Sequence, residues 1–196
     1  MERTARVSHR AVAAVTAVMV TFMLLAVACG RLSADAADSP AVRAPAADGV
    51  AVITKVVDGD TVRVRFAGRG DDEERVRLIG VDTPETHGAG GLRECFGKEA
   101  AARTTALLPP GTQVRLERDA ELRDRYGRLL AYVYRASDDL FVNLTLAREG
   151  FAAPLTVPPN VTYEHDFVAA AAAARAADRG LWGRCGSPDV AVDSPP

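Results

Sequence analysis

The chain has 196 residues, 48% of them hydrophobic, and a formal net charge of −2. This length and apolar content predict one domain with a substantial hydrophobic core. The small negative charge argues against a basic protein that coats nucleic acid, because such a protein carries excess positive charge. It does not exclude an enzyme that concentrates its positive charge in one cleft.

Residues 1–28 have the pattern of an export signal. Three arginines precede an uncharged run, 11–28, that ends in the Ala-Val-Ala of a signal-peptidase site. Cys29 follows directly, and the residues before it resemble a bacterial lipobox. A lipoprotein anchored to the membrane through Cys29, a secreted protein and an uncleaved membrane anchor therefore all remain open. In each case we expect an exported domain, at the cell surface or secreted.

Two segments, 29–48 and 187–196, contain many small, polar and proline residues and almost no large apolar ones. Such a composition predicts a flexible tether and a disordered tail. The folded unit is therefore expected at 49–186, as one domain between these flanks.

The hydrophobic pattern of this unit predicts five strands and three helices. Alternating or β-branched residues indicate the strands, and apolar or alanine-rich stretches that end at proline or glycine indicate the helices. Asn160 and Thr162 are the expected caps of the last helix. Five short strands with interspersed helices favour a β-barrel with helices (α+β), of the OB type. In chain order we expect strands at 50–57, 61–66 and 75–81, a helix at 95–108, strands at 113–117 and 129–135, and helices at 141–149 and 163–178.

Apart from Cys29, the chain contains two cysteines, Cys95 and Cys185. An even pair in an exported domain indicates a disulfide, and two buried free thiols are the alternative. No histidine lies at ligand spacing from either cysteine, so a zinc site is not predicted. A bridge would close a loop of about ninety residues and is expected to be structural.

Carboxylates stand at the ends of the second and third predicted strands. Asp60 belongs to the run Asp-Gly-Asp-Thr at 58–61, and Asp82 follows the third strand. Two carboxylates with carbonyl groups and waters suit Ca²⁺ or Mg²⁺, provided that the two strands are neighbours in the barrel. The Asp-Gly pair alone is explained by a hairpin turn, and such a turn is also able to aim Asp60 into a site.

A further acid and two arginines complete a set suited to phosphate chemistry. Glu85 lies beyond Pro84 in a predicted loop, where a carboxylate can hold a water and accept its proton. Arg77 and Arg128 can each grip two phosphate oxygens, and Tyr126 can stack on a base or contact a phosphate. Taken singly, each of these residues is equally explained as an ordinary loop or surface side chain.

Together the motifs resemble the thermonuclease (staphylococcal nuclease-like) family, over nearly all of 50–182. They are D-G-D-T at 58–61, R-L-x-G-V-D-T-P-E at 77–85, D-x-Y-G-R-x-L-A-Y at 124–132 and G-L-W at 180–182. The resemblance implies an OB-type five-stranded barrel with three helices. It also implies Ca²⁺-dependent cleavage of DNA and RNA.

The resemblance also implies a role for each motif residue. Asp60 and Asp82 correspond to the calcium carboxylates, and the Thr83 carbonyl to a further ligand. Glu85 corresponds to the general base or water-positioning acid. The remaining correspondences are Arg77 and Arg128 as the phosphate-binding arginines, Tyr126 as the tyrosine near the nucleotide phosphate, and Asp58 as an acid beside the metal.

The implied reaction is direct attack of water on the phosphodiester, without a covalent enzyme intermediate, leaving 3′-phosphates. The expected partner is DNA or RNA, and a monomer is expected. Leu155 and Val157 stand where the family has two tyrosines around the terminal nucleotide, so base stacking is expected to differ here. The alternatives are an OB module that binds nucleic acid without cutting it and a structural calcium module.

Overall fold

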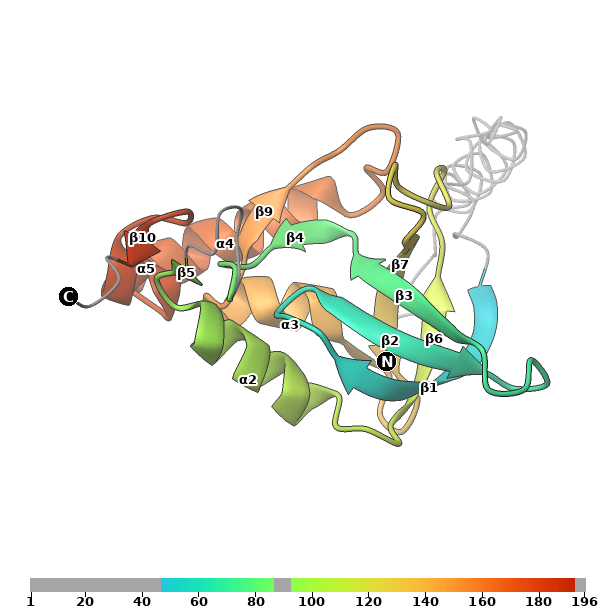
Figure 1. Ribbon diagram of the computed structural model, residues 1–196. Helices are drawn as coiled ribbons and strands as arrows, with labels where there is room; N and C mark the ends of the chain where they lie inside the picture. Colours follow the sequence, from blue (N-terminus) through green and yellow to red (C-terminus); the bar gives the residue numbers. More distant parts are fainter. Residues whose placement is uncertain (1–46, 87–92, 193–196) are drawn as a thin grey trace, which may run out of the picture. The chain divides into compact units, whose positions relative to one another are not determined.

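The computed structural model describes residues 47–86 and 93–192 (Figure 1). The predicted export signal, Cys29 and nearly all of the predicted tether lie outside the described residues. Among the helices of the described part, none has the length and apolar character needed to cross a membrane.

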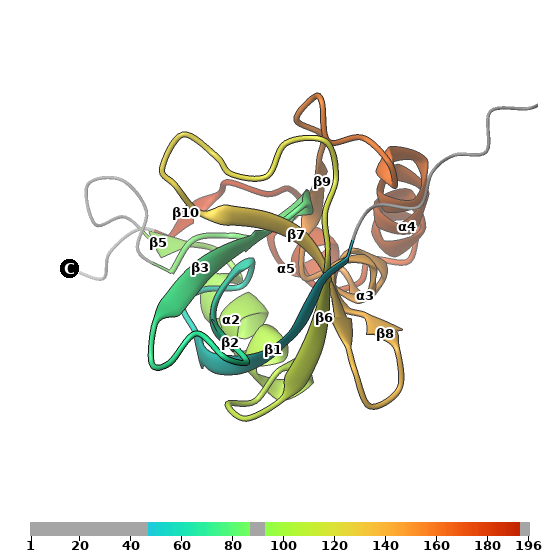
Figure 2. The same cartoon turned by 90° about the vertical axis from the view of Figure 1, so that its right-hand side faces the viewer.

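Five strands close into a barrel, as the OB pattern predicts. Their order is β3-β2-β1-β6-β7, and the barrel closes where β3 pairs with β7 in parallel, while the other pairs are antiparallel. Figure 2 shows these strands ringed around the core, with α3 and α4 on one side of the ring. The barrel strands are β1 (Ala47–Val56), β2 (Thr61–Phe66), β3 (Glu73–Leu78), β6 (Gln113–Glu117) and β7 (Leu129–Arg135).

The described residues hold four helices, one more than the pattern predicts. The three expected ones are α2 (Gly97–Leu107), α3 (Val142–Glu149) and α4 (Glu164–Ala176). The fourth, α5 (Leu181–Cys185), has only five residues, too few for an apolar period to show.

Five short strands lie outside the barrel ring. β8 (Leu140–Phe141) pairs with the end of β7 in antiparallel orientation. β4 (Gly80–Asp82) pairs with β9 (Ala153–Leu155), and β5 (Arg93–Glu94) pairs with β10 (Ala191–Val192). β10 thus lies in the stretch that the sequence assigns to the tail.

The third predicted strand, 75–81, is two strands in the structure. Gly80 has a φ of +83°, and a Cβ atom there would collide with the ring of Phe167. The chain turns at this glycine, so β4 leaves the barrel wall and pairs with β9. This turn brings Asp82 and Thr83 close to the first residue of β2, where Thr83 N–H donates to Asp60.

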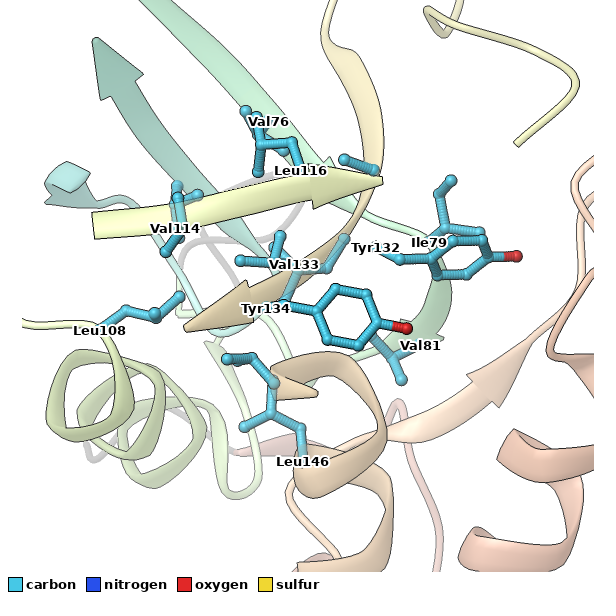
Figure 3. Close-up of a cluster of buried hydrophobic side chains, with 14 of the residues drawn as sticks. Val76, Ile79, Val81, Leu108, Val114, Leu116, Tyr132, Val133, Tyr134 and Leu146 are labelled. Carbon is cyan, nitrogen blue, oxygen red and sulfur yellow. The ribbon is translucent and has the colours of Figure 1, made fainter. Parts of the chain in front are cut away.

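The core lies inside the barrel and continues under the helices. Inward residues of the strands, such as Val76, Val114 and Leu116, are fully buried, and Leu108 and Leu146 approach them from beside α2 and from α3 (Figure 3). β7 is buried on both faces, because Tyr132 packs on its outer side against Tyr163 and Phe167 of the α4 region. Burial on both faces explains why β7 shows a continuous apolar run instead of alternation.

The expected caps of α4 are wrong. The residue before α4 is Tyr163, and no side chain caps the helix. Asn160 instead exchanges two hydrogen bonds with the backbone of Glu121, and Thr162 donates twice to Asp119. These contacts join the β6–β7 loop to the β9–α4 loop, which are the two loops beside the site described below.

Replacing Asn143 by alanine is expected to lower the free energy of unfolding by about 2–4 kcal/mol. Asn143 is fully buried at the start of α3. Its side chain accepts from Val133 N–H and donates to the carbonyls of Ile79 and Ala131, and all three backbone groups would lose a partner. Urea unfolding measures the effect. Thr145→Ala, which removes one partly buried bond to Phe141 on the same helix, is the control and should cost under about 1 kcal/mol; equal losses would contradict the prediction.

Candidate active site

The β1–β2 turn places Asp60 at the mouth of the barrel. Val57 N–H and Asp58 N–H both donate to the Thr61 carbonyl, and Asp60 N–H donates to the Asp58 carboxylate. The hairpin predicted from Asp-Gly is therefore present, and it buries Asp60 to 3% exposure. A buried carboxylate needs several donors or a cation around it.

Asp60 receives those donors from three parts of the chain. One oxygen accepts from the Thr83 amide and hydroxyl, at 3.0 and 3.2 Å. The other accepts from the Thr61 hydroxyl at 3.1 Å and pairs with Arg77 Nε at 3.0 Å. The start of β2 and the end of β4 thus meet at the Asp60 carboxylate.

Arg77 bridges the two predicted metal acids. Its Nη2 donates to Asp82 at 2.7 Å while Nε pairs with Asp60. Nη1 donates to the carbonyls of Leu78 and Val81, and only 12% of the side chain is exposed. Arg77 therefore fixes the turn between β3 and β4 as well as supplying positive charge.

Asp58, Asp60, Asp82 and Glu85 form an acidic cluster. Burial, followed by the charge of Asp60, raises the pKa of Asp58 to about 6. Partial burial and then the charges of Asp58 and Asp60 raise the pKa of Glu85 to about 7, although its side chain is still exposed. Burial also raises the pKa of Asp82 despite the opposing charge of Arg77. The cluster thus holds more negative charge than one arginine neutralises.

The oxygen atoms of this cluster are suitable ligands for a hard divalent cation. Carboxylate oxygens and backbone carbonyls are the ligands that Ca²⁺ and Mg²⁺ take, and the uncompensated charge favours a cation. Across 47–86 and 93–192, no group of three or more His, Cys, Asp and Glu side chains could hold an ion together. Asp60 and Asp82 would therefore need the Thr83 carbonyl and waters to complete a coordination shell.

A second positively charged side chain, Arg128, lies in the turn between β6 and β7. Asp124 accepts from the amides of Tyr126 and Arg128 and pairs with Arg128 Nε at 2.6 Å. Arg128 Nη1 lies 3.4 Å from the Thr61 hydroxyl, beside Asp60. The ring of Tyr126 is 68% exposed, with Arg125 and Arg128 over its faces at 4.8 and 5.5 Å.

A pocket of about 450 Å³ separates these groups from β9. Arg77, Tyr126 and Arg128 line one part of it, and Leu155 and Val157 line another. Leu155 is 39% and Val157 55% exposed. The two positions expected to differ from the family therefore face the same pocket as the arginines, and their contribution to its wall is aliphatic.

The structure brings the motif residues of the site together. Asp60, Arg77, Asp82 and Thr83 are joined by direct hydrogen bonds, Glu85 interacts with the acids through charge, and Arg128 and Tyr126 share the adjacent pocket.

Sequence reasoning missed Glu94, which lies nine residues after Glu85 and belongs to none of the motifs. Its carboxylate accepts from the Glu85 amide at 2.8 Å, and its own amide donates to the Glu85 carbonyl at 2.9 Å. Cys95 and Cys185 are joined in a disulfide, with 6.1 Å between their Cα atoms. A contact between single residues outside a helix or strand period leaves no signal in the sequence, so only the structure reveals Glu94.

Comparison with known proteins shows that this chain is similar to nucleases. The family model described as staphylococcal nuclease homologue matches residues 75–184. The chain is 45% identical to the thermonuclease of Staphylococcus intermedius over 112 residues, which are 57% of this chain and 63% of that protein. It is 37% identical to the thermonuclease of Staphylococcus hyicus over 130 residues, covering 66% and 73% of the two chains. Endonuclease YncB of Bacillus subtilis is 36% identical over 136 residues, covering 68% and 62%. The match thus spans less than two thirds of two of these relatives.

Proposed function

Because this chain belongs to the family of staphylococcal nuclease homologues, we propose that it is a Ca²⁺-dependent nuclease that hydrolyses DNA or RNA. One observation carries the proposal: Arg77 bridges two acids, Asp60 and Asp82, at the wall of a pocket that also holds Arg128. Acids for a hard cation and guanidinium groups for a phosphate are thus present at one place.

In the proposed reaction a water attacks the phosphorus atom directly, and no covalent enzyme intermediate forms. Glu85 holds the water and accepts its proton. Arg77 and Arg128 bind the phosphate oxygens and stabilise the charge that grows on them in the transition state. Tyr126 lies beside Arg128, where it would contact the nucleotide. Cleavage of the 5′ P–O bond would leave 3′-phosphates.

Asp60, Asp82 and the Thr83 carbonyl would hold Ca²⁺, with Asp58 next to them. When bound, the cation polarises a phosphoryl oxygen and neutralises charge. The predicted export signal supports a location outside the cytoplasm, as a secreted monomer or as a lipoprotein held to the membrane through Cys29.

Digestion of single-stranded DNA and of RNA by the purified protein, with Ca²⁺ and with chelator, tests the proposal. We expect cleavage with Ca²⁺, none with chelator, and 3′-phosphate ends on the products. Glu85→Gln keeps the size of the side chain and removes the base, so it should bind substrate and cut it at least a hundredfold more slowly. Binding of nucleic acid by the wild type without cleavage would instead identify a non-catalytic OB module, and Ca²⁺ binding alone would identify a structural calcium module.

Replacing both Leu155 and Val157 by tyrosine is expected to lower KM for single-stranded DNA about tenfold. Both side chains line the pocket and contribute no aromatic face, and stacking of a base on an aromatic ring contributes about 1–3 kcal/mol. Steady-state kinetics at fixed salt measure the change. Val161→Tyr is the control, because Val161 is exposed on the same loop but does not line the pocket; an equal fall in KM for this control would argue for non-specific stacking.

A further inference from the structure

We propose that Glu94 positions Glu85 for hydrolysis, and that the Cys95–Cys185 disulfide holds Glu94 in place, so that breaking the disulfide slows turnover by the folded protein. The inference rests on the proposed function. It goes beyond the purely structural bridge that the sequence predicts, because the bridge lies next to the loop that carries the proposed base.

Two hydrogen bonds join Glu94 to the backbone of Glu85, one donated by each residue. The Glu85 amide donates to the Glu94 carboxylate at 2.8 Å, and the Glu94 amide donates to the Glu85 carbonyl at 2.9 Å. Glu85 follows β4 in a segment without regular structure, where these two hydrogen bonds to Glu94 hold its backbone. We therefore infer that the position of the Glu85 backbone depends on Glu94.

Glu94 in turn is held by the C-terminal segment. It pairs with Ala191 in the two-stranded β5–β10 sheet, and the amide of the next residue, Cys95, donates to the Val190 carbonyl at 2.7 Å. Figure 1 shows β5 and β10 next to α5, which ends at Cys185. A sheet of two strands with two residues each is not stable by itself, so we infer that the disulfide keeps β10 in place.

α2 packs against Glu85 from the other side. A Cβ atom on Gly97, the first residue of α2, would lie 2.6 Å from the Glu85 carbonyl oxygen and 3.0 Å from that of Pro84. Phe96, with a φ of 73°, is the only residue between Cys95 and the helix. Glu85 thus lies between β5 and the start of α2, and the disulfide is attached where those two elements join.

Reduction breaks this arrangement by a balanced exchange. A dithiol such as dithiothreitol gives up two electrons and two protons, the Sγ–Sγ bond of Cys95 and Cys185 breaks, and two cysteine thiols and one cyclic disulfide of the reagent form. Cys185 at the end of α5 then loses its covalent link to Cys95, the residue after β5. We infer that β10, which begins six residues after Cys185, is then free to separate from β5, so that Glu94 loses the strand that holds it against Glu85.

The experiment compares the oxidised protein with the Cys95→Ser/Cys185→Ser variant and with dithiol-treated wild type, well below their melting temperatures. We expect kcat to fall about tenfold and KM to change less than twofold, because the arginine pocket is untouched while the base is misplaced. The control is Arg103→Met, which removes the paired contacts of Arg103 with Glu149 between α2 and α3 at 2.6 and 2.7 Å. It lowers stability without touching β5, so an equal fall of kcat in this variant would overturn the proposal.

Two Glu94 variants separate positioning from charge. Glu94→Gln keeps an acceptor for the Glu85 amide and should retain near-wild-type kcat, whereas Glu94→Ala should lose about as much as the cysteine variant. Equal loss in both would overturn the role of the hydrogen bond.

Amide hydrogen exchange at Glu85 and Glu94 provides a readout that does not need activity. Protection of both amides should fall at least tenfold when the disulfide is absent and stay unchanged in Arg103→Met. If the wild type cuts no nucleic acid, the proposed function fails, while exchange still decides whether the disulfide holds Glu85. Unchanged protection at Glu85 in the cysteine variant would overturn the inference, whatever the activity.

Discussion

Replacing Arg128 by alanine is expected to lower kcat on single-stranded DNA several-hundred-fold, equivalent to about 3–4 kcal/mol of transition-state stabilisation. Arg128 lines the pocket next to Thr61, and its guanidinium is held by Asp124, so little entropy is lost when it meets a phosphate. The fold should survive, because Asp124 keeps its bond from the Tyr126 amide.

Arg125→Ala is the matched control for this variant. Arg125 lies in the same turn, contacts the same tyrosine ring and lines the same pocket, but it is exposed and pairs with no acid of the site. Its loss should change kcat less than about threefold. A similar loss in both variants would mean that the turn supplies general positive charge and that Arg128 has no specific role.

Arg77→Ala should behave differently from Arg128→Ala, since Arg77 is nearly buried. Besides its charge, the variant would lose the partner of Asp60 and the donor to two carbonyls, Leu78 and Val81. Removing one partner of a buried pair leaves the other uncompensated, so a loss of stability of about 3–5 kcal/mol should accompany the loss of activity.

Addition of Ca²⁺ is expected to raise the melting temperature of the wild type by about 5 °C at pH 8, and by much less at pH 5. A ligand at ten times its Kd stabilises by about 1.4 kcal/mol, which gives a shift of this size for a domain of this length. The Asp82→Ala variant should lose the shift, because it removes one of the two carboxylate ligands. Differential scanning calorimetry in Ca²⁺ and in chelator measures both.

The pH dependence follows from the raised pKa values of the acidic cluster. An acid with a raised folded pKa contributes stability below its unfolded pKa, and that contribution is lost as the pH rises through the folded value. Those values are about 6 for Asp58 and about 7 for Glu85. At pH 8 the carboxylates of the metal-free protein are ionised and repel one another. A bound cation therefore stabilises the protein most at this pH. A shift that is equal at both pH values, or retained in Asp82→Ala, would contradict this account.

The sequence predicts the barrel well because its strands carry their own signals. β2 and β6 alternate apolar and polar residues, and β7 is a continuous apolar run, so their bounds match the prediction. The break between β3 and β4 was missed because a positive φ at Gly80 does not disturb the apolar pattern around it. The β4–β9 and β5–β10 pairs were missed because strands of two or three residues have no period.

The residues of the candidate site could be proposed from the sequence, but their arrangement could not. Spacing alone does not bring Asp60 near Asp82. The sequence predicts that they meet only if the second and third predicted strands are neighbours, and the family resemblance implies it. The turn at Gly80 and the bonds from Thr83 to Asp60 provide the physical reason. The dual role of Arg77 was also hidden, because alternation in β3 indicates only that its side chain faces away from the barrel interior.

The parallel pairing of β3 with β7 also determines when activity can appear during folding. Arg77 is aligned with Leu130 across this pair, so the two strands meet only after a long intervening chain has been closed into a loop. Contacts so distant in sequence slow folding to about milliseconds to seconds, whereas helices form in about a microsecond. After dilution from denaturant, the helical signal of α2 and α4 should therefore return before hydrolysis does, because Arg77 and Arg128 share a pocket only once the barrel is closed.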